Sequence, residues 1–243
     1  MQTQTSVARA EFVPLGGDLR GYYAVPAGSG PFPAVVVFQE VFGVNDYIQS
    51  EVRRLAEHGY AAIAPDYFRG ETFTYDQYES KVAAKLRGIS ENDYLADIDA
   101  AMAYLNAARE VKKAQYGVVG FCMGGYQAVL AALSRPQRFA AAVSFYGGGI
   151  APVGEARRPP LIDRLDPITA ELLLIYGVED PSIPPAEHGR LAEKLSTLKK
   201  RYTLSVYAGA GHGFASRDRD HYRKPQAEAA WVEALTLFDR TLR

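Results

Sequence analysis

The stretch YGVVGFCMGG, residues 116–125, decides how the rest of the chain is interpreted. Its first half is apolar and rich in β-branched and aromatic residues, which predicts a buried strand. Its second half places Cys122 between Gly120 and Gly124, and a helix is predicted from about Met123 onward. A strand that turns sharply into a helix at Gly-x-Cys-x-Gly matches the nucleophile-elbow motif, with cysteine in the position of serine.

The glycines around Cys122 have a physical role. The residue at such a turn takes a strained backbone conformation, and a side chain at either flanking position would collide with its neighbours. The helix N-terminus also favours a thiolate. Two other interpretations are weaker. A lone cysteine is often only a small buried apolar residue. A dinucleotide-binding loop would need Gly-x-Gly-x-x-Gly and an acidic residue at the right later strand end, and both are missing here.

The composition of the 243-residue chain limits the classes of function. Apolar residues make up 48% and charged residues 23%, values ordinary for a globular protein. The formal net charge is −1, so nothing drives non-specific binding to nucleic acid or to an anionic membrane. The one cysteine excludes an intrachain disulfide. Because no signal peptide or membrane span is evident, we expect a soluble, cytoplasmic protein, a monomer or small homo-oligomer.

Short apolar runs alternate with amphipathic segments, which predicts an α/β fold with a mostly parallel eight-stranded sheet and helices on both faces. The strands are predicted at 11–15, 19–24, 34–39, 60–65, 115–121, 140–146, 171–177 and 202–207, and the first two form a hairpin that turns at 16–18. The clearest helical faces are Ile48/Val52/Leu55, Leu95/Ile98/Met102/Leu105 and Ala227/Trp231/Leu235/Phe238/Leu242. Residues 67–90 and 147–170 break the alternation after strand ends, where open α/β sheets bind ligands.

A nucleophile at the elbow needs a base and an orienting acid. Asp180 follows one apolar run, and His212 lies between two glycines after the next run. The chain order nucleophile, acid, base agrees with that of elbow enzymes. Glu179 competes with Asp180 for the role of the acid, and spacing alone does not separate them. His221 is the reserve candidate for the base.

Taken together, these residues resemble the dienelactone hydrolase (carboxymethylenebutenolidase) family of the α/β-hydrolase fold over nearly the whole chain. The resemblance rests on QEVFG at 39–43, PDY at 65–67, GFCMGG at 120–125, Gly177 with Asp180, IP at 183–184, and GHGF at 211–214. It implies a single domain, residues 1–243, with a triad of Cys122, His212 and Asp180.

The resemblance also implies supporting residues. Backbone N–H groups of Met123 and Val41 would form the oxyanion hole, and Glu40 would be a fourth catalytic participant that interacts with the thiol. Arginines bind the substrate's carboxylate in the family. The substrate-binding candidates here are Arg217, which is shifted by one place, Arg69 and Arg87, which compete for the upstream position, and Tyr67.

The function expected from the resemblance is hydrolysis of lactones or small carboxylic esters through a covalent acyl-enzyme. One alternative is a general carboxylesterase or thioesterase without a carboxylate anchor, and another is a non-catalytic scaffold that binds a small ligand. The partner is then a small molecule. We expect no metal or organic cofactor, because the histidines and the cysteine show no ligand spacing such as H-E-x-x-H or C-x-x-C.

Overall fold

The computed structural model describes residues 5–155 and 158–243. Strands and helices alternate in an α/β fold with a mostly parallel sheet of eight strands, as the sequence predicts. The strands are β1 (Val7–Gly16), β2 (Leu19–Pro26), β3 (Ala34–Phe38), β4 (Ala61–Pro65), β5 (Tyr116–Phe121), β6 (Phe139–Phe145), β7 (Glu171–Gly177) and β8 (Tyr202–Tyr207). The helices are α1 (Asp46–Glu57), α2 (Ala83–Arg87), α3 (Glu91–Ala107), α4 (Met123–Ser134), α5 (Pro185–Thr197) and α6 (Lys224–Leu242).

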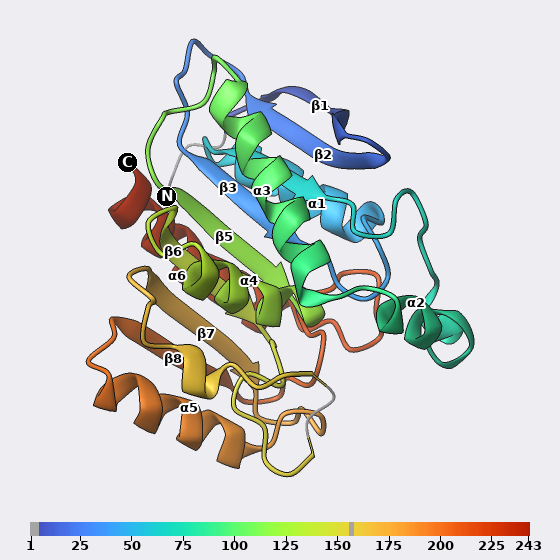
Figure 1. The fold of residues 1–243 in the computed structure, drawn as a ribbon, viewed down its shortest axis with the longest axis vertical. Helices are drawn as coiled ribbons and strands as arrows, with labels where there is room; N and C mark the ends of the chain where they lie inside the picture. Colours follow the sequence, from blue (N-terminus) through green and yellow to red (C-terminus); the bar gives the residue numbers. More distant parts are fainter. Residues whose placement is uncertain (1–4, 156–157) are drawn as a thin grey trace. The chain divides into compact units, whose positions relative to one another are not determined.

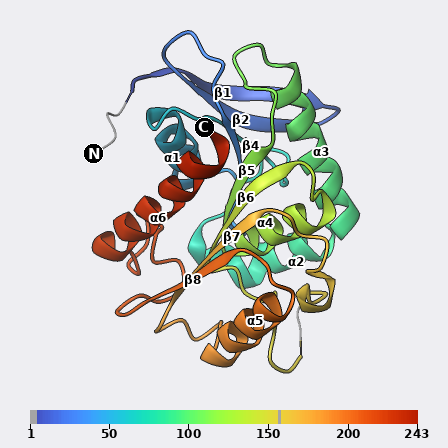
Figure 2. The same ribbon diagram turned by 90° about the vertical axis from the view of Figure 1, so that its left-hand side faces the viewer.

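Two compact units divide the chain, residues 1–116 and 117–243. In the first unit the strand order is β1-β2-β4-β3. The predicted hairpin is confirmed, since β1 pairs antiparallel with β2 around a turn in which Gly16 and Gly17 both have positive φ. The α1 and α3 helices cover opposite faces of these strands (Figures 1 and 2).

Local signals explain where α1 and α3 begin. Asn45 caps α1 by accepting a hydrogen bond from the Ile48 amide at 3.2 Å. Ser90 and Asp93 form a reciprocal capping box at the start of α3. On α1, Ile48, Val52 and Leu55 are all fully buried, so the predicted apolar face of this helix is the face that packs.

The second unit has the strand order β5-β6-β7-β8, with α4 and α5 on one face and α6 on the other (Figure 2). Parallel ladders join β6 to β7 and β7 to β8. The Trp231 ring of α6 packs on Phe121 and Phe145, with centroids 6.0 and 5.5 Å away. Because parallel strands end at one edge, the loops after β6, β7 and β8 open on the same side of this unit.

The structure differs from the sequence expectation at a few ends. The β1 strand starts at Val7, four residues earlier than predicted, because Val7 to Ala10 pair with the far end of β2. The interval 67–90, for which no helix is predicted, contains a 3₁₀ turn (Tyr75–Gln77), a π-helical turn (Tyr78–Val82) and α2. A further 3₁₀ turn, Ile162–Arg164, lies in the interval 147–170.

No helix within residues 5–155 and 158–243 is long and apolar enough to cross a membrane.

At the turn around Cys122, backbone segments approach each other so closely that a side chain would not fit. A Cβ at Gly120 would overlap the carbonyl of Gly124, and one at Gly125 would come within 2.8 Å of Gly147 and of the Phe145 oxygen. Backbone atoms cannot move aside as a flexible side chain can. Both positions therefore require glycine, which the elbow motif predicts for Gly120.

Gly120→Ala should lower the free energy of unfolding by about 1–3 kcal/mol or more, because the new methyl group has no space. Gly189→Ala is the matched control. Gly189 lies inside α5 with nothing near its missing Cβ, so alanine should raise stability by about 0.5–1 kcal/mol. Urea unfolding curves measure both changes, and equal destabilisation of the two variants would contradict this account.

Candidate active site

Cys122 lies between β5 and α4 in a strained backbone conformation, with φ 54° and ψ −115°. Its N–H donates to the Phe145 oxygen of β6 at 3.0 Å, and its carbonyl accepts from the Gly125 amide at 2.9 Å. Such φ values are unfavourable for a residue with a side chain and persist only where the surroundings enforce them. The turn leaves the thiol partly exposed at the N-terminus of α4.

The His212 imidazole connects the Cys122 thiol to the Asp180 carboxylate through two short contacts. His212 Nε2 lies 3.1 Å from Cys122 Sγ, and His212 Nδ1 lies 2.7 Å from Asp180 Oδ2. The imidazole is thus bonded at both nitrogens, with its side chain 26% exposed and that of Asp180 fully buried. This is the arrangement in which a base takes the proton of a nucleophile while an acid orients the base.

The geometry separates the two acids that spacing left open. Asp180 faces the imidazole, and its second oxygen, Oδ1, accepts the Ser182 amide at 2.8 Å, so both carboxylate oxygens are bonded. Glu179 is exposed. His221, the reserve base, is also exposed. The structure therefore brings Asp180 and His212 to Cys122.

The environment of His212 favours its charged form. Burial by itself lowers the pKa of the imidazole. The charge of Cys122 and the hydrogen bonds to Asp180 and to Cys122 oppose burial, and together they raise the pKa of His212 well above the 6.5 of a free histidine. An imidazole with a raised pKa in contact with sulfur is suited to accept the thiol proton.

Met123, one of the two predicted oxyanion donors, is the first residue of α4 and directly follows the nucleophile. The other, Val41, and the predicted participant Glu40 belong to the first unit, where they follow β3. The Glu40 side chain is fully buried and Val41 is 5% exposed. Their predicted roles stay predictions.

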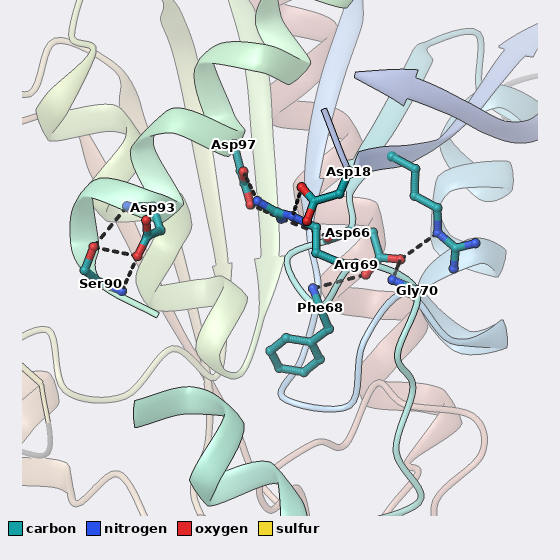
Figure 3. A network of polar contacts seen from close by, with 9 residues as sticks. Asp18, Asp66, Phe68, Arg69, Gly70, Ser90, Asp93 and Asp97 are labelled. Carbon is teal, nitrogen blue, oxygen red and sulfur yellow. Dashed lines mark hydrogen bonds and ion pairs between the residues drawn. The ribbon is translucent and has the colours of Figure 1, made fainter. Parts of the chain in front are cut away.

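Arg69, one of the substrate-binding candidates, is held by acids of its own unit (Figure 3). Its two terminal nitrogens donate to Asp97 at 2.6 and 2.9 Å, and its Nε donates to Asp18 at 3.1 Å. A bidentate Arg–carboxylate pair uses the same fork that would bind a substrate carboxylate. The donors of Arg69 are therefore already engaged in this structure.

The remaining candidates lie in different surroundings. Arg87 is exposed at the end of α2. Tyr67 follows β4 in the chain and is 3% exposed. Arg217 is exposed in the loop after His212.

One further arginine in that loop was missed by sequence reasoning. Arg219 packs against Gly213, the neighbour of the base, so that a Cβ at Gly213 would collide with its guanidinium. The glycine with φ 74° is the visible signal, because it leaves room for a side chain over the histidine loop. The offset of seven residues from His212 gave no reason to select Arg219.

Within the described ranges 5–155 and 158–243, no group of three or more His, Cys, Asp or Glu side chains is arranged to hold a metal ion.

Comparisons with known proteins give one consistent answer. The family model described as "Dienelactone hydrolase family" matches residues 19–242. A Synechocystis sp. protein, named as an inferred carboxymethylenebutenolidase, is 34% identical over 231 residues, 93% of each chain. A Bradyrhizobium sp. protein, named as an inferred 2-oxo-3-(5-oxofuran-2-ylidene)propanoate lactonase, is 32% identical over 236 residues, 95% of this chain and 94% of the other.

Solved structures agree with the sequence relatives. A Klebsiella pneumoniae crystal structure, named as an inferred dienelactone hydrolase, superposes with a TM-score of 0.84 at 29% identity. It covers 96% of this chain and 98% of its own.

Asp180→Asn should lower the pKa of His212, because it removes the negative charge that favours the imidazolium and replaces the charged hydrogen-bond acceptor by a neutral amide. NMR titration of the histidine ring signals, assigned with His212→Gln, measures the shift. Glu179→Gln is the control, since Glu179 does not touch the ring and should leave the pKa of His212 unchanged. A larger shift in the Glu179 variant would mean that the orienting acid is wrongly assigned.

Proposed function

The chain belongs to the dienelactone hydrolase family, and on that premise we propose that it hydrolyses lactones or small carboxylic esters with Cys122 as the nucleophile. The observation that supports this most directly is the line of two short contacts from Cys122 through His212 to Asp180. A buried aspartate, an imidazole with a raised pKa and a thiol at a strained turn form a set that nucleophilic catalysis requires.

In the proposed first half-reaction, His212 Nε2 takes the thiol proton and the sulfur attacks the acyl carbon. A C–S bond forms, and the carbonyl electron pair moves to oxygen, where the Met123 amide donates a hydrogen bond. One such donor is typically worth about 10²–10³ in kcat. When the tetrahedral intermediate collapses, the C–O bond breaks and the leaving alkoxide takes the proton from His212. In a lactone both fragments stay on one molecule.

In the second half-reaction, His212 takes a proton from water, which attacks the thioester. The C–S bond breaks, the sulfur recovers the proton from the imidazolium, and the carboxylic acid leaves. Asp180 holds the imidazole in the tautomer that presents Nε2 to the sulfur. The resemblance adds Val41 as a second oxyanion donor and Glu40 as a partner of the thiol.

The proposed substrate carries its own carboxylate. The Bradyrhizobium relative is named for a propanoate lactone, and two arginines, Arg217 and Arg219, lie in the loop that carries the base. Arg69 already donates to Asp97 and Asp18, so we assign the contact with the substrate's carboxylate to the loop that follows His212. Arg219 is preferred because its guanidinium lies against Gly213, beside His212.

Cys122→Ala should abolish turnover of p-nitrophenyl acetate, because no other thiol exists in the chain. Alkylation of the wild type with one equivalent of iodoacetamide should have the same effect, since it caps the only nucleophile proposed. A stopped-flow burst of p-nitrophenolate, followed by slower turnover, would report the acyl-enzyme. Full activity after complete alkylation would refute the cysteine mechanism, and a folded, inactive His212→Ala serves as the control for the base.

Arg219→Ala should raise KM for a lactone that bears a free carboxylate by about 10-fold or more, because a charged hydrogen bond to the substrate is lost. It should leave KM for the methyl ester of the same lactone unchanged. Arg217→Ala is the matched comparison on the same loop. Equal effects on the charged and neutral substrates would favour the general esterase, and a larger effect of Arg217→Ala would transfer the contact to that residue.

A further inference from the structure

The segment Tyr146–Ala151, which directly follows β6, contacts the first turn of α4 after Cys122, the His212 ring and the segment after Asp180. We call this segment the strap. No catalytic role falls to it in the mechanism above, and it contains three consecutive glycines, residues 147–149. It contacts the His212 ring directly, and it contacts the first turn of α4 and the segments around Asp180 through other residues.

The strap begins against the nucleophile. The carbonyl of Phe145, the residue before it, accepts the Cys122 amide at 3.0 Å. At Gly147 the backbone approaches the first turn of α4 so closely that a Cβ would overlap Gly125 and Tyr126. These two contacts therefore fix both the distance between the strap and α4 and the position of the Cys122 turn.

The first side chain of the strap lies against the base. The Tyr146 ring meets the His212 ring edge-on, with centroids 5.3 Å apart, and meets the Phe214 ring at 5.6 Å. Tyr146 is fully buried and has φ 40°. A non-glycine residue keeps such a conformation only where its surroundings hold it. The Tyr146 amide donates to the Ile175 oxygen of β7 at 2.7 Å, and the residues that follow Tyr146 are anchored as well.

Residues before and after Asp180 anchor the strap. Gly148 packs on the Ile183 side chain, in the loop between Asp180 and α5. Tyr176 of β7 donates a long hydrogen bond, 3.4 Å, to the Gly147 oxygen. The strongest anchor comes from Glu187 in the first turns of α5, whose Oε1 accepts both the Gly149 amide at 2.8 Å and the Ala151 amide at 3.1 Å.

Glu187 is an unusual residue for a surface helix. It is 3% exposed, and carboxylates are almost never so buried unless strong partners compensate them. Glu193, six residues further along the same helix, is exposed. A buried carboxylate that bonds two amides of one loop fixes that loop to the helix that begins just after the acid.

We propose that Glu187 is a positioning residue for the triad, which acts by clamping the strap so that Tyr146 holds the His212 ring between Cys122 and Asp180. This inference rests on the proposed function, because it assigns a purpose to the ring position. Substrate and the reacting atoms are not touched by Glu187. Its effect passes through the amides of Gly149 and Ala151.

Glu187→Ala tests the clamp, since it removes both hydrogen bonds and leaves two amides without their acceptor. A misplacement of about 1 Å at a catalytic group can cost about 10²-fold in rate. We therefore expect kcat for p-nitrophenyl acetate to fall by about 10- to 100-fold with KM nearly unchanged. Glu187→Gln should stay within about 3-fold of wild type, because the amide oxygen can accept the same two bonds. Glu193→Gln, the matched control on α5, should behave as wild type.

A second readout does not depend on turnover. The rate at which iodoacetamide alkylates Cys122 at pH 7 reports how well His212 supports the thiolate. It should fall in Glu187→Ala and recover in Glu187→Gln. Circular dichroism and thermal melting establish that each variant is folded. If Glu187→Ala does not yield folded protein, Glu187→Asp applies the same test, because it withdraws the carboxylate by one methylene.

Two outcomes would overturn the clamp. One is a folded Glu187→Ala that keeps wild-type kcat and alkylation rate while only its melting temperature falls, which is the behaviour of a purely structural residue. The other is a Glu187→Gln as impaired as Glu187→Ala. Failure of the proposed function looks different, because turnover would then survive in Cys122→Ala whatever happens at Glu187.

Discussion

The hydrogen bond from the Cys122 amide to the Phe145 carbonyl, made across a turn with φ 54°, is the constraint on which the second unit depends. A cysteine backbone does not adopt this conformation unaided. The close contact of Gly120 with Gly124 and of Gly125 with Gly147 makes room for it, and the α4 helix begins where it ends. The position of the thiol is therefore a property of two neighbouring strands and a helix, rather than of a flexible loop.

The parallel strands of this unit explain how distant residues converge. Each of β6, β7 and β8 delivers its following loop to the same edge, so Asp180 and His212 approach although 32 residues separate them in the sequence. The imidazole then bridges a buried carboxylate and a partly exposed sulfur. Its raised pKa is a consequence of that bridge, which outweighs the opposing effect of burial.

Much of this arrangement could be predicted from the sequence, because it is encoded locally. Glycines at fixed offsets from Cys122 specify the turn, apolar runs specify the strands, and the chain order specifies nucleophile, acid and base. Asp180 and Glu179 could not be distinguished, since adjacent residues in a turn point in directions that only the fold determines. Arg219 and Glu187 were invisible for a related reason. Glu187 bonds two amides that lie 38 and 36 residues earlier in the chain, and Arg219 folds back on Gly213 within an irregular loop. No periodicity in the sequence records either contact.

The β8 strand ends the order of the sheet, so within the second unit it has β7 as its one neighbour. His212 follows this strand, whereas Cys122 follows β5 and Asp180 follows β7. The proposed base is thus carried by an edge strand, and the free energy of local opening is highest for the core strands of a fold. Heat or denaturant that unfolds β8 locally would move His212 away from Cys122 while Cys122 and α4 stay folded. We therefore expect loss of activity to precede global unfolding in this architecture.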